Sequence, residues 1–338
     1  MKAVFLVNNG SASSAFDIRE VATPVPSASQ ILIKVAAFGL NFADVMARKG
    51  MYKEAPPKPC VLGYDVAGTV AAVGSSVKNV SVGDAVTAMT RFGGYAEYAI
   101  TESTAVARIP TGVDAATATT LTTQYCTAYY AAMMQVNLRE GDKVLVHSGA
   151  GGVGMALVQI ALHKKCTVFS TAGSQKKLDF LKQNGVHYPL NYTTSDFASE
   201  IRRLTSGAGI DVIFDAVGGS SVRKGINILA AGGRIVCYGA SEMSSRSLPG
   251  KIAAALAFGI YHPVMFMMAS KSIIGVNMLA IADHKPDIIR EALEGVVDLT
   301  EKGVLTPYPA TKFHVSEIAA AHDALEKRQT MGKVAVYW

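Results

Sequence analysis

The clearest chemical signal in the sequence is a set of three glycines, Gly149, Gly151 and Gly154, which follow an apolar run at 144–146. In a Gly-x-Gly-x-x-Gly turn, the glycines permit a tight bend, a close approach of the backbone to a pyrophosphate, and packing of a helix on a strand. A helix-like segment at 155–162 and a strand-like segment at 166–171 follow at the required distance. The predicted dinucleotide-binding residues of the turn are Gly149, Ala150, Gly151, Gly152, Val153 and Gly154. The alternative is a glycine-rich loop that only reverses the chain.

The residues after the second strand indicate which dinucleotide is bound. An NAD site usually has an acidic side chain about 20 residues beyond the glycines, but the first acid here is Asp179, inside the next predicted helix. The chain instead offers Thr171, Ser174, Lys176 and Lys177, which suit a 2′-phosphate. We therefore predict NADPH as the cofactor, with a solvated helix face as the alternative role for the two lysines.

The composition describes an ordinary folded protein. The chain has 338 residues, of which 50% are hydrophobic and 17% charged, and its four cysteines show no paired spacing. The net charge of +6 arises in the segment 122–268, which fits an anionic cofactor. No interleaving of basic and aromatic residues indicates nucleic-acid binding. No targeting segment is evident, so we expect a cytoplasmic protein.

Two patterns of secondary structure divide the chain. Residues 1–121 read as short strands separated by Gly and Pro, which predicts a mainly antiparallel, barrel-like domain. Residues 122–268 alternate strand and helix, which predicts an α/β, doubly wound parallel sheet of the Rossmann type. Residues 269–338 are expected to return to the first domain.

Several motifs resemble those of the medium-chain dehydrogenase/reductase family. They include Gly-Gly-Tyr-Ala-Glu-Tyr at 93–98, Leu-Asn-Phe-Ala-Asp at 40–44, Tyr-Gly-Ala-Ser at 238–241 and Met-Gly-Lys-Val at 331–334. The chain looks like the zinc-independent quinone oxidoreductase (zeta-crystallin) branch, and within it most like the vesicle amine transport protein homologues. The resemblance implies a GroES-like catalytic domain at 1–121 and 269–338, beside a Rossmann domain at 122–268.

The chain departs from the zinc-dependent members of that family at the positions that would hold metal. Asn41 stands where they have a cysteine, and Gly-Tyr-Asp at 63–65 replaces Gly-His-Glu. No cysteine lies between Cys60 and Cys126, where a structural zinc site would need four. We therefore expect a metal-free enzyme, for which an already electrophilic acceptor such as a quinone or an enone is more suitable than an alcohol.

The resemblance implies three catalytic candidates, Asn41, Tyr52 and Thr127. Asn41 would contact the nicotinamide or the acceptor oxygen, Tyr52 would lie over the acceptor, and Thr127 would lie near the nicotinamide ribose. Each has an alternative in the sequence. Asn41 with Asp44 is typical of a helix N-cap with its third-position acid, and Tyr52 beside Lys53 could cover surface. No acid or base is assigned, since solvent could supply the proton.

Further cofactor contacts are expected outside the glycine turn. Residues 239–241 follow a predicted strand, at the sheet edge where ligands bind in such folds. The resemblance places Tyr192 at the adenine side. The remaining candidate cofactor-binding residues are Tyr192, Tyr238, Gly239, Ala240, Ser241 and Lys333.

An uncharged stretch covers 252–270. A single helix of that length would approach the thickness of a bilayer, but Gly259 and the step from His262 to Pro263 should break it, so we expect no transmembrane segment. The stretch is expected to be an apolar flap over the acceptor pocket or a dimer surface. The strand at 271–278 resembles the edge strand through which the family forms homodimers.

Three functions remain open from the sequence. The first is an NADPH-dependent, zinc-free quinone reductase, and the second is a 2-alkenal or enone reductase using the same residues. The third is a non-enzymatic NADPH-binding protein that handles membranes or lipids, although no amphipathic basic helix is evident.

Overall fold

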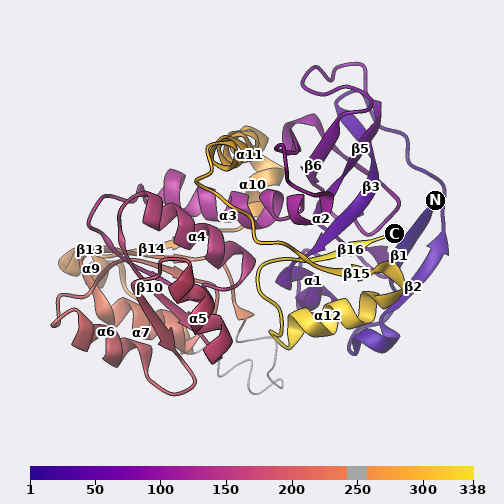
Figure 1. The fold of residues 1–338 in the computed structure, drawn as a ribbon. Helices are drawn as coiled ribbons and strands as arrows, with labels where there is room; N and C mark the ends of the chain where they lie inside the picture. The colour runs from indigo at the N-terminus through magenta and orange to yellow at the C-terminus, as the bar shows by residue number, and fades with distance from the viewer. Residues whose placement is uncertain (242–256) are drawn as a thin grey trace. The chain divides into compact units, whose positions relative to one another are not determined.

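The computed structural model describes residues 1–241 and 257–338, which divide into two units (Figure 1). The first unit comprises Met1–Cys126 and Met278–Trp338, and the second comprises Thr127–Asn277. In the first unit, β16 (Val334–Tyr337) pairs antiparallel with β3 (Gln30–Leu40). A strand from the C-terminal segment therefore belongs to a sheet formed mainly by N-terminal residues.

The strands of the first unit form two sheets. The larger sheet has the order β15-β16-β3-β5-β6-β8, with β7 paired to β3, and only β15 and β16 run parallel. The smaller sheet has the order β2-β1-β4. The remaining bounds are β1 Lys2–Leu6, β2 Phe16–Glu20, β4 Cys60–Val61, β5 Asp65–Val73, β6 Ala85–Met89, β7 Tyr98–Glu102, β8 Val106–Arg108 and β15 Thr311–His314. The antiparallel domain predicted from the alternating strands is confirmed.

The helices of the first unit surround these sheets. They are α1 (Phe42–Arg48), α2 (Ala115–Ala118), α10 (Met278–His284), α11 (Pro286–Glu301) and α12 (Ile318–Glu326). Short helical turns lie at Ala12–Ser14, Ser103–Ala105 and Val315–Glu317. After α2, the chain stays helical through Leu121–Tyr125, α3 (Cys126–Tyr129) and Tyr130–Gln135, and the first and last of these segments are π-helical. Alpha-helices interrupted by π turns are frequent at functional sites.

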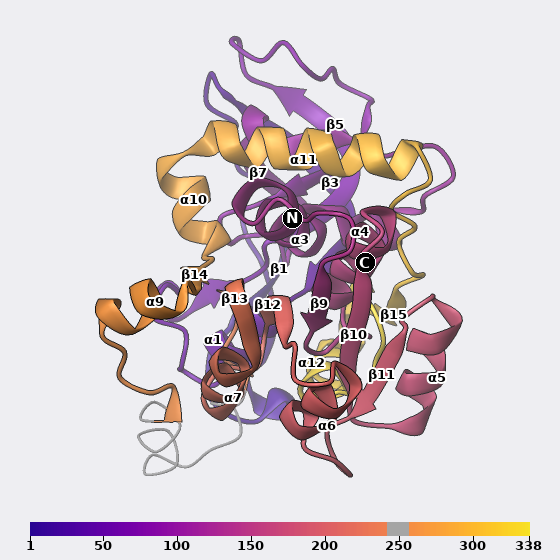
Figure 2. The ribbon, with the colours of Figure 1, turned by 90° about the vertical axis from the view of Figure 1, so that its left-hand side faces the viewer.

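The second unit is built on six parallel strands in the order β11-β10-β9-β12-β13-β14. In chain order this is 3-2-1-4-5-6, the order of the doubly wound Rossmann fold. Figure 2 shows these strands side by side, from β14 at the left to β11 at the right. Their bounds are β9 Lys143–Val146, β10 Thr167–Ala172, β11 Tyr188–Asn191, β12 Ile210–Asp215, β13 Leu229–Cys237 and β14 Ser272–Gly275. The predicted fold class is therefore confirmed.

The helices of the second unit alternate with its strands along the chain. They are α4 (Gly152–His163), α5 (Gln175–Gln183), α6 (Phe197–Leu204), α7 (Ser220–Ile228) and α9 (Pro263–Ala269). The sequence predicts a strand at 234–238, whereas β13 runs from Leu229 to Cys237. Gly232 and Gly233 are typical of a turn, yet here they lie within a strand whose register with β12 shifts between Ile210 and Val212.

The uncharged stretch 252–270 is described only from residue 257 onward. His262 is the N-cap of α9 and Pro263 is its first residue, so the predicted helix break at this step is confirmed. Met265, Met267 and Met268 of α9 are exposed. Among the described residues, no helix has both the length and the apolar composition to cross a membrane.

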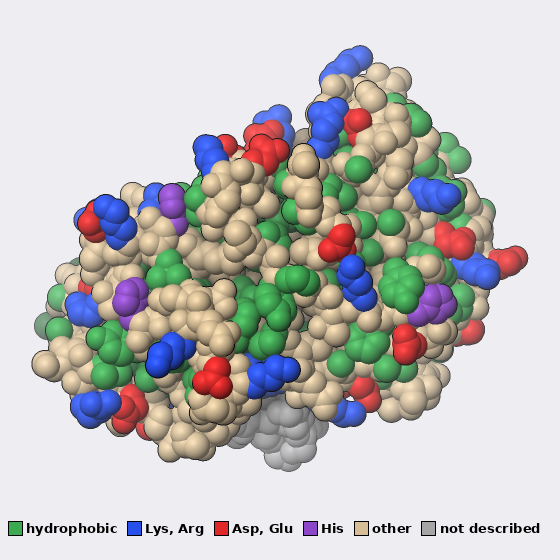
Figure 3. Space-filling view, in the orientation of Figure 1, with side chains coloured by type: hydrophobic (Ala, Val, Ile, Leu, Met, Phe, Trp, Pro, Cys, Tyr) green, Lys and Arg blue, Asp and Glu red, His purple; other side chains and the backbone are tan. Residues whose placement is uncertain are grey.

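Charged side chains are dispersed over the face shown in Figure 3. There, Lys and Arg side chains alternate with acidic and uncharged ones and form no single continuous patch. The basic excess of the sequence is thus not gathered into one region of that face.

Candidate functional site

The carboxyl ends of the parallel strands bring most of the predicted cofactor residues to one edge of the second unit's sheet. The turn at 147–151 follows β9, the segment 171–177 closes β10 and opens α5, and Tyr192 follows β11 directly. Tyr238–Ser241 follow β13, and the amide of Tyr238 donates to the Asp215 carbonyl at the end of β12. Ligands of doubly wound folds bind outside this edge, at the point where the strand order reverses, which lies here between β9 and β12.

The three glycines of the turn differ in what a Cβ atom would meet at each position. A Cβ on Gly149 would collide with Ser170 Oγ, and a Cβ on Gly154 would collide with the Ser148 carbonyl and the Gly149 backbone. A Cβ on Gly151 would meet only the Ser148 carbonyl oxygen, at 3.2 Å. Packing therefore requires the first and third glycines, whereas at the middle position a Cβ would make a single tight contact with a carbonyl oxygen.

The start of α5 presents the predicted phosphate-binding side chains. Ser174 is the N-cap of α5, Lys176 is exposed, and Lys177 is half-buried in the first turn. The Tyr192 side chain lies against Gly173, where a Cβ would overlap its ring and hydroxyl. Two cations, a hydroxyl and the N-terminus of α5 fit a phosphate on the ribose, so this edge fits NADPH.

Sequence reasoning assigned no role to His147. This residue follows β9, and its ring lies close to Thr171 of β10 and to Asp215 of β12. Thr171 Oγ1 accepts from the Ser148 amide at 3.3 Å and lies 3.1 Å from His147 Nδ1. Nε2 of the same ring lies 3.8 Å from an Asp215 carboxylate oxygen. Burial lowers the pKa of His147, so the ring is neutral at pH 7.

A hydrogen-bonded carboxylate holds the loop beyond β12. Asp215 accepts from the amides of Val217 and Gly218, both at 2.7 Å, and from the Ser221 hydroxyl. The edge around the glycine turn is therefore held by side-chain bonds as well as by the strand ladder.

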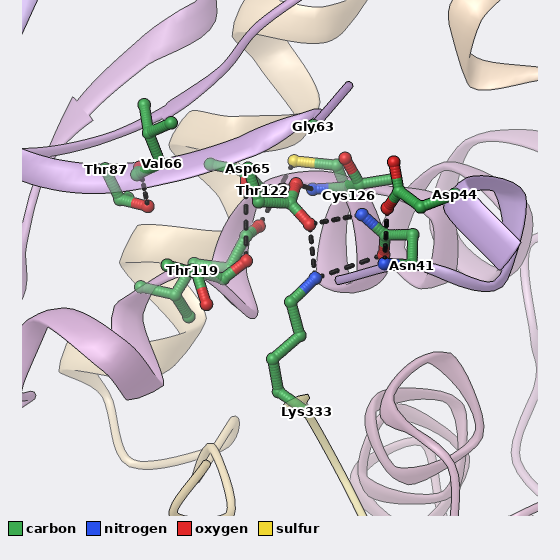
Figure 4. A network of polar contacts seen from close by, with 12 residues as sticks. Asn41, Asp44, Gly63, Asp65, Val66, Thr87, Thr119, Thr122, Cys126 and Lys333 are labelled. Atoms are coloured by element: carbon green, nitrogen blue, oxygen red, sulfur yellow. Dashed lines mark hydrogen bonds and ion pairs between the residues drawn. The ribbon is translucent and has the colours of Figure 1, made fainter. Parts of the chain in front are cut away.

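In the first unit, a buried ion pair gathers the residues around Asn41 (Figure 4). Asp65, the first residue of β5, accepts from Lys333 Nζ, from Asn41 Nδ2 at 2.5 Å, from Thr122 Oγ1 at 2.7 Å and from the Thr123 amide at 2.9 Å. Four donors match the acceptor capacity of a carboxylate. Lys333 Nζ also donates to Asn41 Oδ1 at 3.1 Å.

A glycine makes room for the lysine of this cluster. A Cβ on Gly39 of β3 would overlap Lys333 Cε, and it would lie 2.9 Å from Lys333 Nζ and from Thr119 Oγ1. Lys333 and Asp65 are fully buried. The ammonium therefore reaches Asp65 only because β3 has no side chain at this position.

Asn41 is the N-cap of α1, and its side chain belongs to the buried cluster. Its backbone amide donates to Asp44 Oδ2 at 2.7 Å at the start of α1, as expected for an N-cap and its third-position acid. Its side chain also bonds to Asp65 and Lys333. The amide is thus held in one orientation by two opposite charges.

Asp44 lies in the same buried region. Burial, with the nearby Asp65 carboxylate, raises the pKa of Asp44 to about 7, against the opposing effects of the Asn41 amide and Lys333. Asp44 Oδ1 is buried and has no hydrogen-bond partner. A neutral carboxylic acid is therefore substantially populated at this site near pH 7.

The hydroxyl group of Tyr95 contacts a buried histidine. Tyr95 Oη is 3.2 Å from His322 Nε2, and both side chains are fully buried. Burial, together with the Arg48 guanidinium, lowers the pKa of His322 to about 3. The Asp44 carboxylate adds to burial in raising the pKa of Tyr95.

The remaining candidates are Tyr52, Thr127 and Lys333. Tyr52 follows α1 and packs partly buried against the core of the first unit, with its ring centroid 6.4 Å from that of Tyr64. Thr127 is buried in α3 and belongs to the second unit. Lys333, expected near the cofactor, is the lysine of the buried pair.

The residues at the former zinc positions do not fit a zinc ion. Zinc is bound by thiolate, imidazole or carboxylate groups, whereas this region presents the Asn41 amide, the Tyr64 phenol and the Asp65 carboxylate, which is already paired with the Lys333 ammonium. Among the described residues, no group of three or more His, Cys, Asp or Glu side chains is arranged to hold a metal ion.

Comparison with known proteins agrees with this architecture. The family described as "Alcohol dehydrogenase GroES-like domain" matches residues 27–111, and the family described as "Zinc-binding dehydrogenase" matches residues 152–296. The human synaptic vesicle membrane protein VAT-1 homolog is 33% identical over 320 residues, which cover 94% of this chain and 81% of that protein.

The chain belongs to the medium-chain dehydrogenase/reductase family. The VAT-1 homolog of Danio rerio is 32% identical over 316 residues, which cover 92% of this chain. The chain spans only 64% of the length of that relative. A mycobacterial protein solved in complex with NADPH is 28% identical, with a TM-score of 0.88 and full coverage of both chains.

Two further solved structures share the medium-chain dehydrogenase/reductase fold. CurK enoyl reductase is 27% identical, with a TM-score of 0.86 over 99% of both chains. An Escherichia coli quinone oxidoreductase complexed with NADPH has a TM-score of 0.87 at 24% identity over the whole of both chains, which supports the fold alone.

The glycine turn generates a first prediction. Gly149→Ala and Gly154→Ala should each lower the free energy of unfolding by about 1–3 kcal/mol, because the added methyl group collides with packed atoms. Gly151→Ala should leave stability nearly unchanged but weaken NADPH binding about tenfold or more. Thermal unfolding and NADPH fluorescence titration measure the two effects. Wild-type NADPH affinity in Gly151→Ala would contradict the assignment of the turn.

The buried ion pair generates a second prediction. Lys333→Met should lower the free energy of unfolding by about 3–5 kcal/mol, because it leaves the Asp65 carboxylate buried without its counter-ion. The double variant with Asp65→Asn should lose less than Lys333→Met alone. Lys312→Met removes a half-exposed ion pair with Asp114 and is the matched control, expected to cost about 1 kcal/mol or less. If urea unfolding showed the same loss of stability for the two lysine variants, the buried ion pair would stabilise the fold no more than the half-exposed one.

Asp44 and His322 generate a third prediction, because their pKa values shift in opposite directions. The native state keeps the Asp44 proton up to about pH 7, whereas the unfolded chain loses it near 3.8, so this group makes stability fall as pH rises between those values. Native His322 stays neutral down to about pH 3, whereas the unfolded chain binds a proton below 6.5, so this group makes stability fall as pH drops.

The two effects nearly cancel in the wild type over the range where they overlap. Asp44→Asn should therefore expose a loss of stability on acidification below pH 6.5, and His322→Gln should expose a loss on raising the pH from 4 to 7. Urea midpoints measured across pH 4–8 test both slopes. If the urea midpoints of both variants followed pH in parallel with those of the wild type, the pKa values of Asp44 and His322 would not be shifted as described.

Proposed function

We propose that the protein is an NADPH-dependent, zinc-free reductase that transfers hydride to quinones. The observation that carries the proposal is the edge of the second unit's sheet. There, Gly151 lies at the strand-order reversal, and α5 begins with Ser174, Lys176 and Lys177 in place of an acidic residue. Similarity to a mycobacterial protein complexed with NADPH supports the same cofactor.

When bound, NADPH would supply the hydride. The turn at 149–154 would hold the pyrophosphate through backbone N–H groups, and Lys176 and Lys177 would bind the 2′-phosphate with Ser174, Thr171 and Tyr192. The segment 238–241 would contact the nicotinamide end at the strand ends. The role of the protein is to bind and orient the reactant, since the chemistry belongs to the cofactor.

Asn41, Tyr52 and Thr127 are the proposed acceptor-side residues. The Asn41 amide uses one N–H and one lone pair on Asp65 and Lys333, which leaves its second N–H as a donor of fixed direction. A donor held in place costs no reorganisation as negative charge develops on an acceptor oxygen. Tyr52 would cover the acceptor ring, and Thr127 would lie near the ribose.

A second candidate activity is the reduction of 2-alkenals or enones. Its specific support is the similarity to CurK enoyl reductase. The same residues would serve, because both acceptors are electrophilic and both develop negative charge on oxygen when hydride is added.

Two further expectations accompany the proposed activity. We propose a homodimer paired along β14, which is the outermost strand at one side of the six-stranded sheet. Ile273 of this strand is 40% exposed. We also propose a cytoplasmic location.

The proposed cofactor preference is tested with Lys176→Ala combined with Lys177→Ala. Loss of charge-assisted contacts worth about 1.5–3 kcal/mol should raise the KM for NADPH by tenfold or more and leave the KM for NADH unchanged. Steady-state NADPH oxidation with 9,10-phenanthrenequinone and with 2-alkenals measures the effect and ranks the two activities. Lys182→Ala, in the last turn of the same helix, is the matched control and should change neither constant.

An unaltered KM for NADPH in the double variant would contradict the phosphate assignment. Faster turnover of 2-alkenals would favour the second activity over the first. Absence of NADPH oxidation with every acceptor, together with NADPH and liposome binding, would instead favour a non-enzymatic protein that handles lipids.

A further inference from the structure

The residue that opens the glycine turn has a backbone conformation that its side chain disfavours. Ser148, between His147 and Gly149, has a φ of 58°, in the left-handed region. Residues other than glycine keep such a conformation only where the surrounding structure holds them in it, and they gather at ligand-binding sites. The Ser148 carbonyl accepts from the Gly151 amide at 2.9 Å, and it is the nearest atom to a Cβ built on Gly154. The direction of this peptide group therefore shapes the turn.

A side-chain hydroxyl holds the amide of Ser148. Thr171 Oγ1, on the neighbouring strand β10, accepts from this amide at 3.3 Å, and the Thr171 carbonyl accepts from the Gly149 amide at 3.2 Å. Two successive amides of the turn are thus bound to one residue of β10. Thr171 is only 1% exposed, so water hardly competes for its hydroxyl. The conformation of Ser148 therefore depends on where the Thr171 hydroxyl lies.

His147 fixes the position of that hydroxyl. Its Nδ1 lies 3.1 Å from Thr171 Oγ1, in a hydrogen bond for which either atom can be the donor. The buried ring packs edge-on against Phe197 of α6, with the ring centroids 4.7 Å apart and the ring planes at 81°. The His147 backbone amide donates to the Phe214 carbonyl of β12 at 3.0 Å. Both the backbone and the ring of His147 are therefore anchored within the second unit.

The other ring nitrogen faces the loop beyond β12. His147 Nε2 lies 3.8 Å from an Asp215 carboxylate oxygen, which is beyond hydrogen-bond distance. Asp215 is already bound by the amides of Val217 and Gly218 at 2.7 Å and by the Ser221 hydroxyl. The closer polar contact of the ring is therefore the one through Nδ1, on the side of the glycine turn.

We propose that His147 is a positioning residue of the cofactor site: through the Thr171 hydroxyl it keeps Ser148 in the left-handed conformation, and so aligns the amides of the glycine turn with the pyrophosphate of the dinucleotide. This inference rests on the proposed function, because it takes the turn to bind a dinucleotide. NADPH and NADH share the pyrophosphate and differ in the 2′-phosphate. Loss of this support should therefore weaken the binding of both to the same degree.

Two substitutions distinguish the ring nitrogens of His147. An Asn side chain carries an N–H and an oxygen close to the position of Nδ1, so His147→Asn should bind NADPH within about twofold of the wild type, whichever way the bond is directed. A Gln amide lies farther out, near the position of Nε2. His147→Gln should raise the Kd for NADPH and for NADH about tenfold each, equivalent to about 1.4 kcal/mol, the size of one hydrogen bond's net contribution. Fluorescence titration measures both constants.

Thr171→Val is an independent variant, which removes the hydroxyl and keeps the branched shape of the side chain. It should raise both constants as much as His147→Gln does, and combining the two substitutions should add no further loss, because the two groups act in series. Adding Ser148→Gly to Thr171→Val should restore the affinity for both dinucleotides, because glycine adopts a positive φ without support. Glycine would not reverse a general loss of packing.

His187→Gln is the matched control. His187 Nδ1 accepts from the Val168 amide at 3.1 Å, near the amino end of β10 and away from the glycine turn. This substitution therefore removes a similar contact from the same sheet, and it should leave the Kd for both dinucleotides unchanged.

Three outcomes would overturn the proposal. The first is wild-type affinity for both dinucleotides in Thr171→Val or in a folded His147→Gln variant. The second is a loss confined to NADPH, because Thr171 would then act on the 2′-phosphate rather than on the turn. The third is a failure of Ser148→Gly to restore affinity in Thr171→Val.

The same titrations separate this inference from the proposed function. A wild-type protein that binds NADPH, with every variant binding it equally well, would keep the cofactor and lose only the role of His147. A wild-type protein that binds neither dinucleotide would overturn the proposed function, and the role of His147 with it.

Discussion

The first unit depends on one buried charge pair, that between Asp65 and Lys333. Because neither side chain reaches water, each charge must be satisfied by protein groups, and the Asp65 carboxylate takes four hydrogen bonds to achieve this. Those bonds join the beginning of β5, the N-terminus of α1, the π-helical segment at 121–125 and the residue before β16. One interaction thus positions Asn41 and joins distant segments of the chain.

The same requirement explains why the pKa values of Asp44 and His322 differ from those of solvent-exposed carboxyl and imidazole groups. Each would be charged over part of the physiological range in water, but burial favours the neutral form of both. At pH 5, for example, an exposed carboxylate and an exposed imidazolium become a neutral acid and a neutral ring on folding. The two groups are therefore neutralised with little net uptake of protons, so the combined cost of burying them changes little with pH over this range.

In the second unit, the backbone organises the candidate cofactor site. Parallel strands place all their carboxyl ends at one edge, so residues separated by many positions, such as Gly151, Lys176 and Ser241, come to that edge through topology alone. Side chains then stiffen it: His147 and Thr171 join two strand ends, and Asp215 holds the loop after a third. The two units thus prepare their sites differently, one by buried charge and the other by strand order.

Local pattern was enough to predict the order of strand, turn and helix, the glycine turn, the lysines at the start of α5 and the helix break at His262. Each of these features depends on neighbours within a few residues. It was also enough for the backbone N-cap at Asn41, but not for the side chain, which turns to partners 24 and 292 residues away. The Asp65–Lys333 pair, separated by 268 residues, and the contact of Tyr95 with His322, separated by 227, left no periodic signal. Periodicity and turn chemistry report on the backbone, whereas the pairing and protonation of buried charges are decided only when the tertiary structure removes them from water.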